Sequence, residues 1–131
     1  MKPIPDTHLD ILQKASFANI ATVDADGMPQ VTPVWIDYED GYFLLNSAAG
    51  RKKDRNLRAR PQIALSIVDK DDPYRYIGVQ GRVVEITEQG GEEHIHKLSR
   101  KYVGHDYTGL TPGQVRVIYK IEPDRVWTMG E

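Results

Sequence analysis

Short runs of β-branched and aromatic residues, separated by turn-forming residues, constrain the fold of this chain most strongly. Residues 17–23 and 30–38 are such runs, and segment 24–27, with its Asp-Gly pair, lies between them. A second Asp-Gly pair, within 39–41, precedes a third run at 42–46. Asp-Gly pairs between apolar runs are typical of tight turns in antiparallel hairpins. The first third of the chain is therefore predicted to be a three-stranded meander.

Two further strands are predicted in the middle of the chain. Residues 63–68 are apolar on both faces, which is typical of a central strand that is buried on both sides. Residues 76–87 alternate between apolar and polar side chains. Gly78 and Gly81 lie within this second run, and they indicate a bulge or a sharp bend.

The last strand is expected over residues 116–127, with an interruption near Pro123. Thr7 is expected to cap the first of several short helices. These helices are predicted at residues 7–14, 52–60 and 91–102. About six strands with two or three short helices predict a mainly β barrel rather than alternating strands and helices. No repeat or linker divides residues 1–131, so we predict one domain.

The composition excludes several classes of site and partner. The chain of 131 residues has no cysteine, which rules out disulfides, thiolate nucleophiles and cysteine-ligated metal sites. Its formal net charge of -2 provides no overall attraction to nucleic acids or anionic membranes. No run approaches the roughly 18 apolar residues of a membrane span, and the first residues resemble neither a signal nor a transit peptide. We therefore expect a cytoplasmic protein without a membrane or nucleic-acid partner.

The basic segment, defined as residues 51–60, is the most unusual feature of the sequence. It holds six of the 17 Lys and Arg residues, follows the small residues 48–50 and opens a predicted helix. The first turn of a helix carries unpaired N–H groups and the positive end of the dipole, so cations there are unfavourable unless an anion binds. A phosphate would accept hydrogen bonds from these N–H groups and from Arg51 and Lys53. The small residues would let it approach the backbone closely.

Two other interpretations of the basic segment stay open. A run of charges is commonly the solvated face of a helix, without any ligand. A run of cations can also bind RNA. RNA-binding segments usually interleave cations with stacking aromatic residues, however, and this one contains no aromatic residue.

An edge strand and several aromatic residues are candidate contacts for a planar ring. Pro33 cannot donate a hydrogen bond to a sheet, so its strand belongs at an edge or a bulge, where backbone groups stay open to a ligand. Trp35, in the same strand, is more typical of an anchor in the core or in a dimer interface. Tyr74 and Tyr76 share one face of a strand, where they either wall a ring or pack in the core.

No arrangement of side chains indicates acid–base, nucleophilic or metal chemistry. His94 and His96 lie two residues apart in a predicted helix, so they project to different sides and cannot chelate one metal ion. No serine lies in a Gly-x-Ser-x-Gly motif, and the carboxylates are scattered over turns. We therefore predict neither a catalytic side chain nor a metal site, and a bound cofactor would have to carry the chemistry.

Four segments resemble, in their order, the pyridoxamine 5'-phosphate oxidase-like split β-barrels, especially the small branch that uses the deazaflavin coenzyme F-420. The matching stretches are ATV at 21–23 with DGMPQVTPVW at 26–35, KDRNLR at 53–58, YIGVQGR at 76–82 and LSRKY at 98–102. The resemblance covers nearly the whole chain. It implies a six-stranded split β-barrel of the FMN-binding type that forms a homodimer, with the cofactor at the subunit interface.

The resemblance also implies which residues bind the cofactor. They comprise a group along the ring, a group between ring and phosphate tail, a group at the tail, and aromatic residues that complete the pocket. In this order they are Thr32, Pro33 and Val34; Asn46 and Ser47; Arg51, Lys52, Lys53 and Asn56; and Tyr74, Tyr76 and Trp127, the last from the second subunit.

The leading functional hypothesis is hydride transfer from reduced F-420 to a small conjugated acceptor such as a quinone. The cofactor would carry this chemistry, and the protein would orient the ring and bind the tail. FMN is the alternative cofactor, because FMN-binding and F-420-binding members of the family share the phosphate loop. A flavin-binding protein without catalytic activity would use the same pocket.

Overall fold

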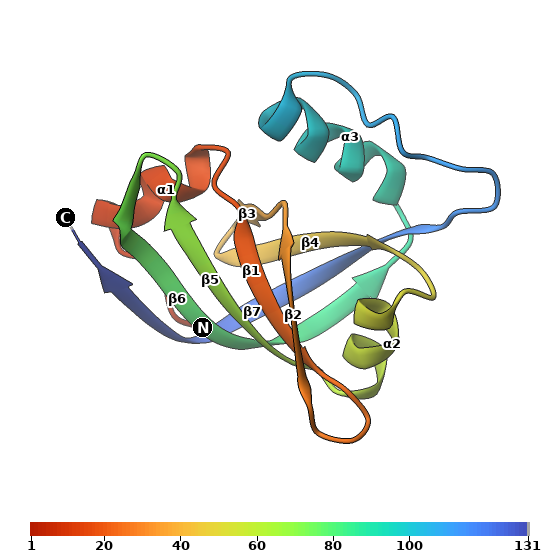
Figure 1. The fold of residues 1–131 in the computed structure, drawn as a ribbon, viewed down its shortest axis with the longest axis horizontal. Helices are drawn as coiled ribbons and strands as arrows, with labels where there is room; N and C mark the ends of the chain where they lie inside the picture. Colours follow the sequence, from red (N-terminus) through yellow and green to blue (C-terminus); the bar gives the residue numbers. More distant parts are fainter. Residues whose placement is uncertain (131) are drawn as a thin grey trace.

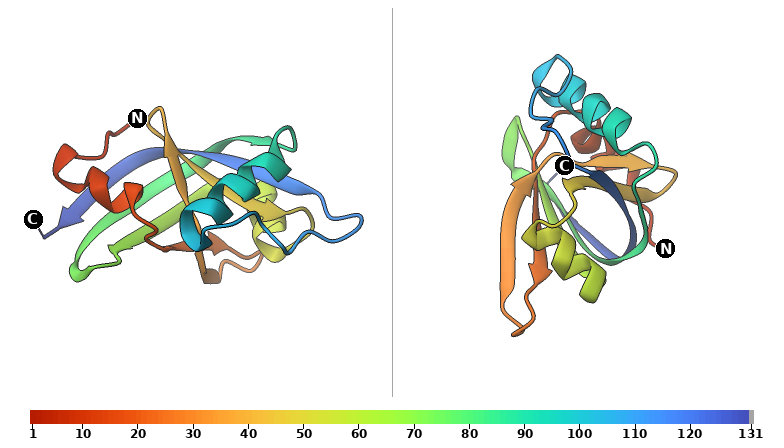
Figure 2. Two further views of the ribbon diagram at one scale, coloured as in Figure 1. Left: turned by 90° about the horizontal axis from the view of Figure 1, so that it is seen from above. Right: turned by 90° about the vertical axis from the view of Figure 1, so that its right-hand side faces the viewer.

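Seven antiparallel strands form a single curved sheet in the computed structural model, which describes residues 1–130 (Figure 1). The strands are β1 (Ala18–Val23), β2 (Pro29–Val34), β3 (Asp37–Glu39), β4 (Tyr42–Ala48), β5 (Gln62–Asp69), β6 (Asp72–Thr87) and β7 (Arg116–Met129). Their order in the sheet is β2-β1-β5-β6-β7-β4-β3. Only Trp35 and Ile36 join β2 to β3, the two end strands, so the sheet curves round into a barrel (Figure 2).

The core fills the inside of this barrel. Alternate residues of the strands point inward because successive side chains of a strand lie on opposite faces. The inward set is almost entirely aliphatic and aromatic, and its fully buried members include Ile20, Phe43, Leu45, Ile67, Ile77, Val79, Tyr119 and Ile121. Burying one such side chain contributes about 1.5–3 kcal/mol, so these residues supply most of the driving force for folding.

The two longest strands, β6 and β7, bend where their pairing shifts register. One shift lies between Gln80 and Gly81, which confirms the predicted bulge. A side chain at Gly81 would place its Cβ 2.3 Å from the carbonyl oxygen of Glu122, so only glycine fits there. Gly78 has a different role, because the indole of Trp127 lies over it. Pro123 pairs with Gly81 at the bend, so the predicted interruption of the last strand is wrong: β7 is continuous.

Two other strand predictions need correction. The sheet has seven strands rather than six because the predicted strand 30–38 breaks at Trp35 and Ile36, where the chain crosses from β2 to β3. The predicted burial of β5 on both faces is also wrong. Its residues alternate between buried and partly exposed, and the outward-facing Ala64 lines an open hollow.

The helices cover the two ends and one side of the barrel (Figures 1 and 2). They are η1 (Asp6–His8), α1 (Leu9–Gln13), α2 (Lys52–Ala59) and α3 (Gly91–Val103). Thr7 does not cap a helix as predicted, because its hydroxyl bonds Nδ1 of His8 instead. Helix α3 ends at Gly104, whose φ of +87° permits a left-handed C-terminal cap. Among residues 1–130, no helix combines the length and apolarity that a membrane span requires.

Candidate functional site

A cavity of about 240 Å³ lies where β2, β4, β7, α2 and α3 meet. The structure brings together half of the twelve predicted cofactor-binding residues at its wall. These six are Pro33, Val34, Asn46, Ser47, Arg51 and Lys53. The basic segment and the edge strand, which are remote in sequence, therefore converge on one site.

The start of α2 is stabilised mainly by Asp54, which the sequence analysis did not single out. This carboxylate lies in the first turn and accepts a hydrogen bond of 2.9 Å from the backbone N–H of Gly50. It also accepts hydrogen bonds from Tyr119 and Arg58. Burial alone would raise the pKa of Asp54, but these hydrogen bonds outweigh burial and hold the pKa below its ordinary value. The helix dipole is thus already offset in part within the chain.

Four of the six cations of the basic segment bond to the protein itself. The pairs are Lys52 with the carboxylate of Asp24 at 3.0 Å, Arg55 with the carbonyl of Gly50 at 2.6 Å, Arg58 with Asp54 at 2.9 Å, and Arg60 with the carbonyl of Val23 at 2.8 Å. These four are structural or solvated cations. Arg51 and Lys53 are the two that remain, and both line the cavity.

Arg116 joins these two cations in the cavity wall and was missed by the sequence analysis. Within residues 1–130, no carboxylate forms an ion pair with Arg51, Lys53 or Arg116. Burial lowers the pKa of Lys53, and the charges of Arg51 and Arg116 lower it further. Burial is also the main reason that the pKa of Arg116 lies below its ordinary value. Three clustered cations that repel one another form a site for an anion.

Ser47 supplies an unpartnered polar group at the same place. Its Oγ is buried and has no hydrogen-bond partner within the described chain, although Ser47 lines the cavity. An unpaired buried hydroxyl is unfavourable by about 1–3 kcal/mol, and a ligand that bonds it recovers this energy. A phosphate, which accepts several hydrogen bonds, fits this set of one hydroxyl and three cations.

Aromatic residues also line the cavity. Phe17, Trp35 and Tyr107 line it. Trp35 stacks on Tyr102 with 5.6 Å between ring centroids and meets Tyr107 edge-on at 6.1 Å. Phe17 is about half exposed, so part of an apolar ring surface is open to a ligand beside the cations. The predicted role of Trp35 as a packing anchor agrees with this stack, and the residue also borders the cavity.

The other six predicted residues do not line this cavity. Asn56 is buried and donates to Oγ1 of Thr22 and Oδ1 of Asp24, so its amide is used inside the protein. Lys52 pairs with Asp24. Thr32 lies on β2 with a buried hydroxyl that has no partner among residues 1–130.

The three aromatic residues in this second group lie where β6 begins and β7 ends, the region that Arg75 bonds to Asp10 of α1; Figure 1 shows this end of the two strands beside α1 and away from α2. Tyr74 and Tyr76 are on β6 and Trp127 is on β7, over Gly78. Tyr74 is 82 % exposed, so the predicted alternative of core packing does not apply to it. Within one chain these residues cannot wall the same pocket as Arg51.

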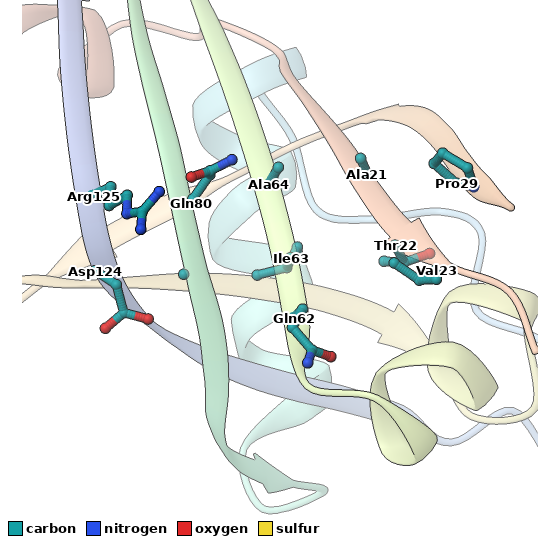
Figure 3. A pocket seen from close by; sticks show the side chains of 11 residues that line it. Ala21, Thr22, Val23, Pro29, Gln62, Ile63, Ala64, Gln80, Asp124 and Arg125 are labelled. Carbon is teal, nitrogen blue, oxygen red and sulfur yellow. The ribbon is translucent and has the colours of Figure 1, made fainter. Parts of the chain in front are cut away.

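A second hollow, of about 460 Å³, lies on the outer face of the sheet (Figure 3). Short side chains from β1 and β5 form its floor, among them Ala21 and Ala64, and Gln80, Asp124 and Arg125 border it. Of the outward-facing apolar residues of β5, Ala64 lines this hollow. It contains no cluster of cations.

Arg116 could not have been recognised from its local sequence. It is the first residue of an otherwise unremarkable strand, and it reaches the cavity because it pairs with Ala48, next to the loop that opens α2. That pairing brings together positions 68 residues apart, and no spacing rule in a single sequence predicts it. Phe17 and Tyr107 escaped notice for the same reason.

Comparisons with known proteins agree with this architecture. The model of the pyridoxamine 5'-phosphate oxidase family matches residues 4–130. A solved structure described as an F420 reductase is 30% identical, with a TM-score of 0.85 over 95% of this chain and 98% of its own. General stress protein 26 of Bacillus anthracis, at 20% identity and a TM-score of 0.71 over 95% of this chain and 92% of its own, is similar in fold alone.

A curated relative carries a different activity. The heme oxygenase HutZ of Vibrio cholerae is 25% identical over 122 residues, which are 86% of this chain and 68% of HutZ. Relatives of one fold therefore include proteins named for a deazaflavin and for heme. Fold similarity alone does not choose between these cofactors.

Proposed function

Because the chain belongs to the pyridoxamine 5'-phosphate oxidase family, we propose that it is an oxidoreductase that holds a flavin-type cofactor by its phosphate tail. Coenzyme F-420 is the first candidate, and the similarity to an F420 reductase supports it. FMN is the alternative, since both molecules join a flat ring to a phosphate. The substrate would be a small conjugated acceptor.

The observation that carries this proposal is the set of unpaired polar groups in one cavity. Arg51, Lys53 and Arg116 lack a carboxylate partner within residues 1–130, and Ser47 has a buried hydroxyl without a partner. Buried polar groups, such as the guanidinium of Arg116 and the hydroxyl of Ser47, are rarely left unsatisfied unless a ligand completes them, and the half-buried Lys53 and the exposed Arg51 add positive charge beside them. An anion with several oxygen acceptors would satisfy all four residues together.

The bound ring would supply hydride transfer, and the residues of this chain would bind and orient it. Arg51 and Lys53 would hold the phosphate at the start of α2, and Ser47 would donate its hydroxyl to it. The edge strand β2, with Pro33 and Val34 at the cavity, would lie along the ring. Water would be kept from the ring by the aromatic wall at Trp35.

A homodimer is part of this proposal, with the cofactor at the subunit interface. The outer hollow of the sheet, with its short side chains, would receive the second subunit (Figure 3). Tyr76 and Trp127 lie on that sheet face, and Trp127 is 45 % exposed. In a dimer these rings could reach the cavity of the other subunit, which they cannot reach within their own chain.

Fluorescence titration of F-420 and of FMN with Lys53→Ala tests the assignment. We expect the substitution to weaken binding of the true cofactor by about 1–3 kcal/mol, the range for losing a charge-assisted hydrogen bond. Lys52→Ala is the matched control because it removes the same charge one position away from a residue that already pairs with Asp24. Equal effects of the two substitutions, or none, would contradict phosphate binding at Lys53.

The similarity to HutZ makes heme the competing cofactor to test. No histidine lines the cavity, and the buried His94 has both ring nitrogens in hydrogen bonds with other residues. We therefore expect no histidine-ligated Soret band after incubation with hemin. A flavin carrier without activity would bind FMN or F-420 with the same dependence on Lys53 but would reduce no acceptor.

A further inference from the structure

We propose that Arg116 is a third anion-binding residue of the cavity, and that His94 and Asp37 are positioning residues that hold it through Asn46. The inference rests on the proposed function, because Arg116 would contact the same anionic tail as the cations of the basic segment. It adds a buried hydrogen-bond chain that links the cavity to α3 and to β3.

Within residues 1–130, the guanidinium of Arg116 is held by neutral groups alone. The residue is 4 % exposed. Its Nε donates to Oδ1 of Asn46 at 2.9 Å, its Nη1 donates to Oε1 of Gln114 at 3.4 Å, and it lies over the ring of Tyr107 at 5.3 Å. A guanidinium has five N–H donors, so these contacts fix its orientation and leave donors for a ligand in the cavity.

The side-chain amide of Asn46 has only one possible orientation. Its oxygen must face Arg116, because a guanidinium can only donate. Its Nδ2 donates to the carbonyl of Gly91 at 2.9 Å and to Nδ1 of His94 at 3.2 Å. Because a backbone carbonyl can only accept, the contact with Gly91 fixes the same orientation independently.

This orientation determines the tautomer of His94, a residue that is 7 % exposed. Its Nδ1 accepts from Asn46 and therefore carries no proton, so the proton is on Nε2 and is donated to Oδ2 of Asp37 at 3.1 Å. Asp37 also accepts from Lys97 at 3.0 Å and from its neighbouring backbone N–H. Arg116, Asn46 and His94 thus form a one-way chain of donors that ends at a carboxylate.

The carboxylate of Asp37, at the end of this hydrogen-bond chain, is ionised. Burial would raise the pKa of Asp37, but the hydrogen bonds from His94 and Lys97 outweigh burial and hold the pKa well below its usual range. A charged acceptor strengthens the bond from Nε2–H, and chains of hydrogen bonds polarise one another. The hydrogen-bond chain therefore restricts the motion of the Asn46 side chain and, through Asn46, that of Arg116.

Backbone packing also ties α3 to the hydrogen-bond chain that runs from Arg116 to Asp37. The first residue of α3, Gly91, approaches β7 so closely that a Cβ would lie 2.2 Å from the carbonyl oxygen of Arg116. The contact sets the distance between the helix that carries His94 and the strand that carries Arg116. Holding a ligand-binding arginine in place before the ligand arrives reduces the entropy lost on binding.

The test is a double-mutant cycle measured by fluorescence titration with whichever of F-420 and FMN binds the wild-type protein. Arg116→Met should weaken binding about 10–100-fold, because it removes charge-assisted hydrogen bonds. His94→Leu should weaken binding about 3–10-fold, and in the Arg116→Met background it should have no further effect. His94→Gln should stay within about twofold of wild type, because its amide can accept from Asn46 and donate to Asp37.

The outcomes separate this inference from the proposed function. If Lys53→Ala weakens binding while Arg116→Met does not, the inference is wrong and the cofactor assignment stands. If the effects of Arg116→Met and His94→Leu add, His94 does not act through Arg116 and the positioning role is wrong. If Lys53→Ala has no effect, the proposed function itself fails.

A measurement on the wild-type protein covers the case in which His94→Leu does not fold or no cofactor binds. Nitrogen-15 NMR of histidine-labelled protein reports which ring nitrogen carries the proton. The hydrogen-bond chain requires an unprotonated Nδ1 and a protonated Nε2 in His94. A signal from a protonated Nδ1 at neutral pH would contradict the proposed hydrogen-bond chain.

Discussion

The two ends of the barrel each bury an arginine, but in opposite electrostatic surroundings. At the α1 end, Arg75 donates to the carboxylates of Asp10 at 2.7 Å and Asp69 at 2.8 Å. At the α2 end, the acceptors of Arg116 in the described part of the chain are all neutral, and Arg116 lies near Lys53. Hydrogen bonds to the two carboxylates raise the pKa of Arg75, whereas burial lowers the pKa of Arg116.

Arg75 is a cation that stabilises the fold, whereas Arg116 is a cation that is available to a ligand. The two arginines are buried to a similar extent, at 8 % and 4 % exposed, so burial does not distinguish them. The difference is whether the protein supplies the counter-charge. Arg75 joins α1 to the β5–β6 hairpin, whereas Arg116 accepts no counter-charge from residues 1–130 and would, in our proposal, receive it from the cofactor.

The largest expected effect is a loss of stability at the α1 end of the barrel, where Arg75 pairs with two carboxylates. Arg75→Met removes the buried guanidinium that pairs with Asp69 and Asp10 and leaves Asp69 with Lys14 alone as its cationic partner, and removing one member of a buried ion pair is strongly destabilising. We expect the melting temperature to fall by on the order of 10 °C or more in thermal denaturation. Cofactor affinity of the folded protein should stay within about twofold if Arg75 is purely structural. A stable Arg75→Met variant would remove the contrast between the two ends.

Low pH should also lower the stability that the α1 end contributes to the fold. Hydrogen bonds from the backbone of Asp71 and from Lys14 and Arg75 lower the pKa of Asp69 to about 2, against about 3.9 in an unfolded chain. The stability that this lowered pKa supplies is complete above about pH 4 and disappears as the pH falls toward about 2. Melting curves of wild type and Asp69→Asn should therefore differ most near neutral pH and converge as the pH falls to about 2.

Asn56 offers an intermediate case, because it lies at the cofactor end but is fully bonded inside the protein. Its amide donates to Thr22 and Asp24. Asn56→Ala should lower the free energy of unfolding by about 1–3 kcal/mol in urea denaturation. It should change cofactor affinity less than threefold, by about half a kcal/mol. A large loss of affinity with unchanged stability would return Asn56 to the cofactor-binding set that the family resemblance implied.

The smallest expected effect has the opposite sign. Lys53→Met removes one of three cations that repel one another, so the protein without cofactor should melt about 1–3 °C higher than wild type. Lys52→Met is the matched control and should not raise the melting temperature, because Lys52 loses its pair with Asp24. A Lys53→Met variant that is clearly destabilised would indicate an internal partner for Lys53.

The sequence predicted local features well because each had a local cause. The bulge at Gly81, the edge position of Pro33 and the bounds of α2 follow from residue types whose backbone preferences are strong. The break between β2 and β3 was missed because Trp35 and Ile36 are good strand residues. The chain turns at Trp35 and Ile36 because the sheet ends there, although both residues have a high strand propensity.

The candidate site was predicted only in part for the same reason. Arg51 and Lys53 could be chosen because both lie at the start of one helix. The roles of Arg116, Asn46 and His94 depend on the pairing of β4 with β7 and on the approach of α3, which are long-range contacts. Helical spacing could not show that His94 bonds Asn46.

The most direct test of the account is a crystal structure of the protein with its cofactor bound, grown in turn with F-420 and with FMN. The account predicts phosphate oxygens within hydrogen-bond distance of Arg51, Lys53 and the hydroxyl of Ser47, at the start of α2. A phosphate bound elsewhere, out of hydrogen-bond reach of these three side chains, would contradict it.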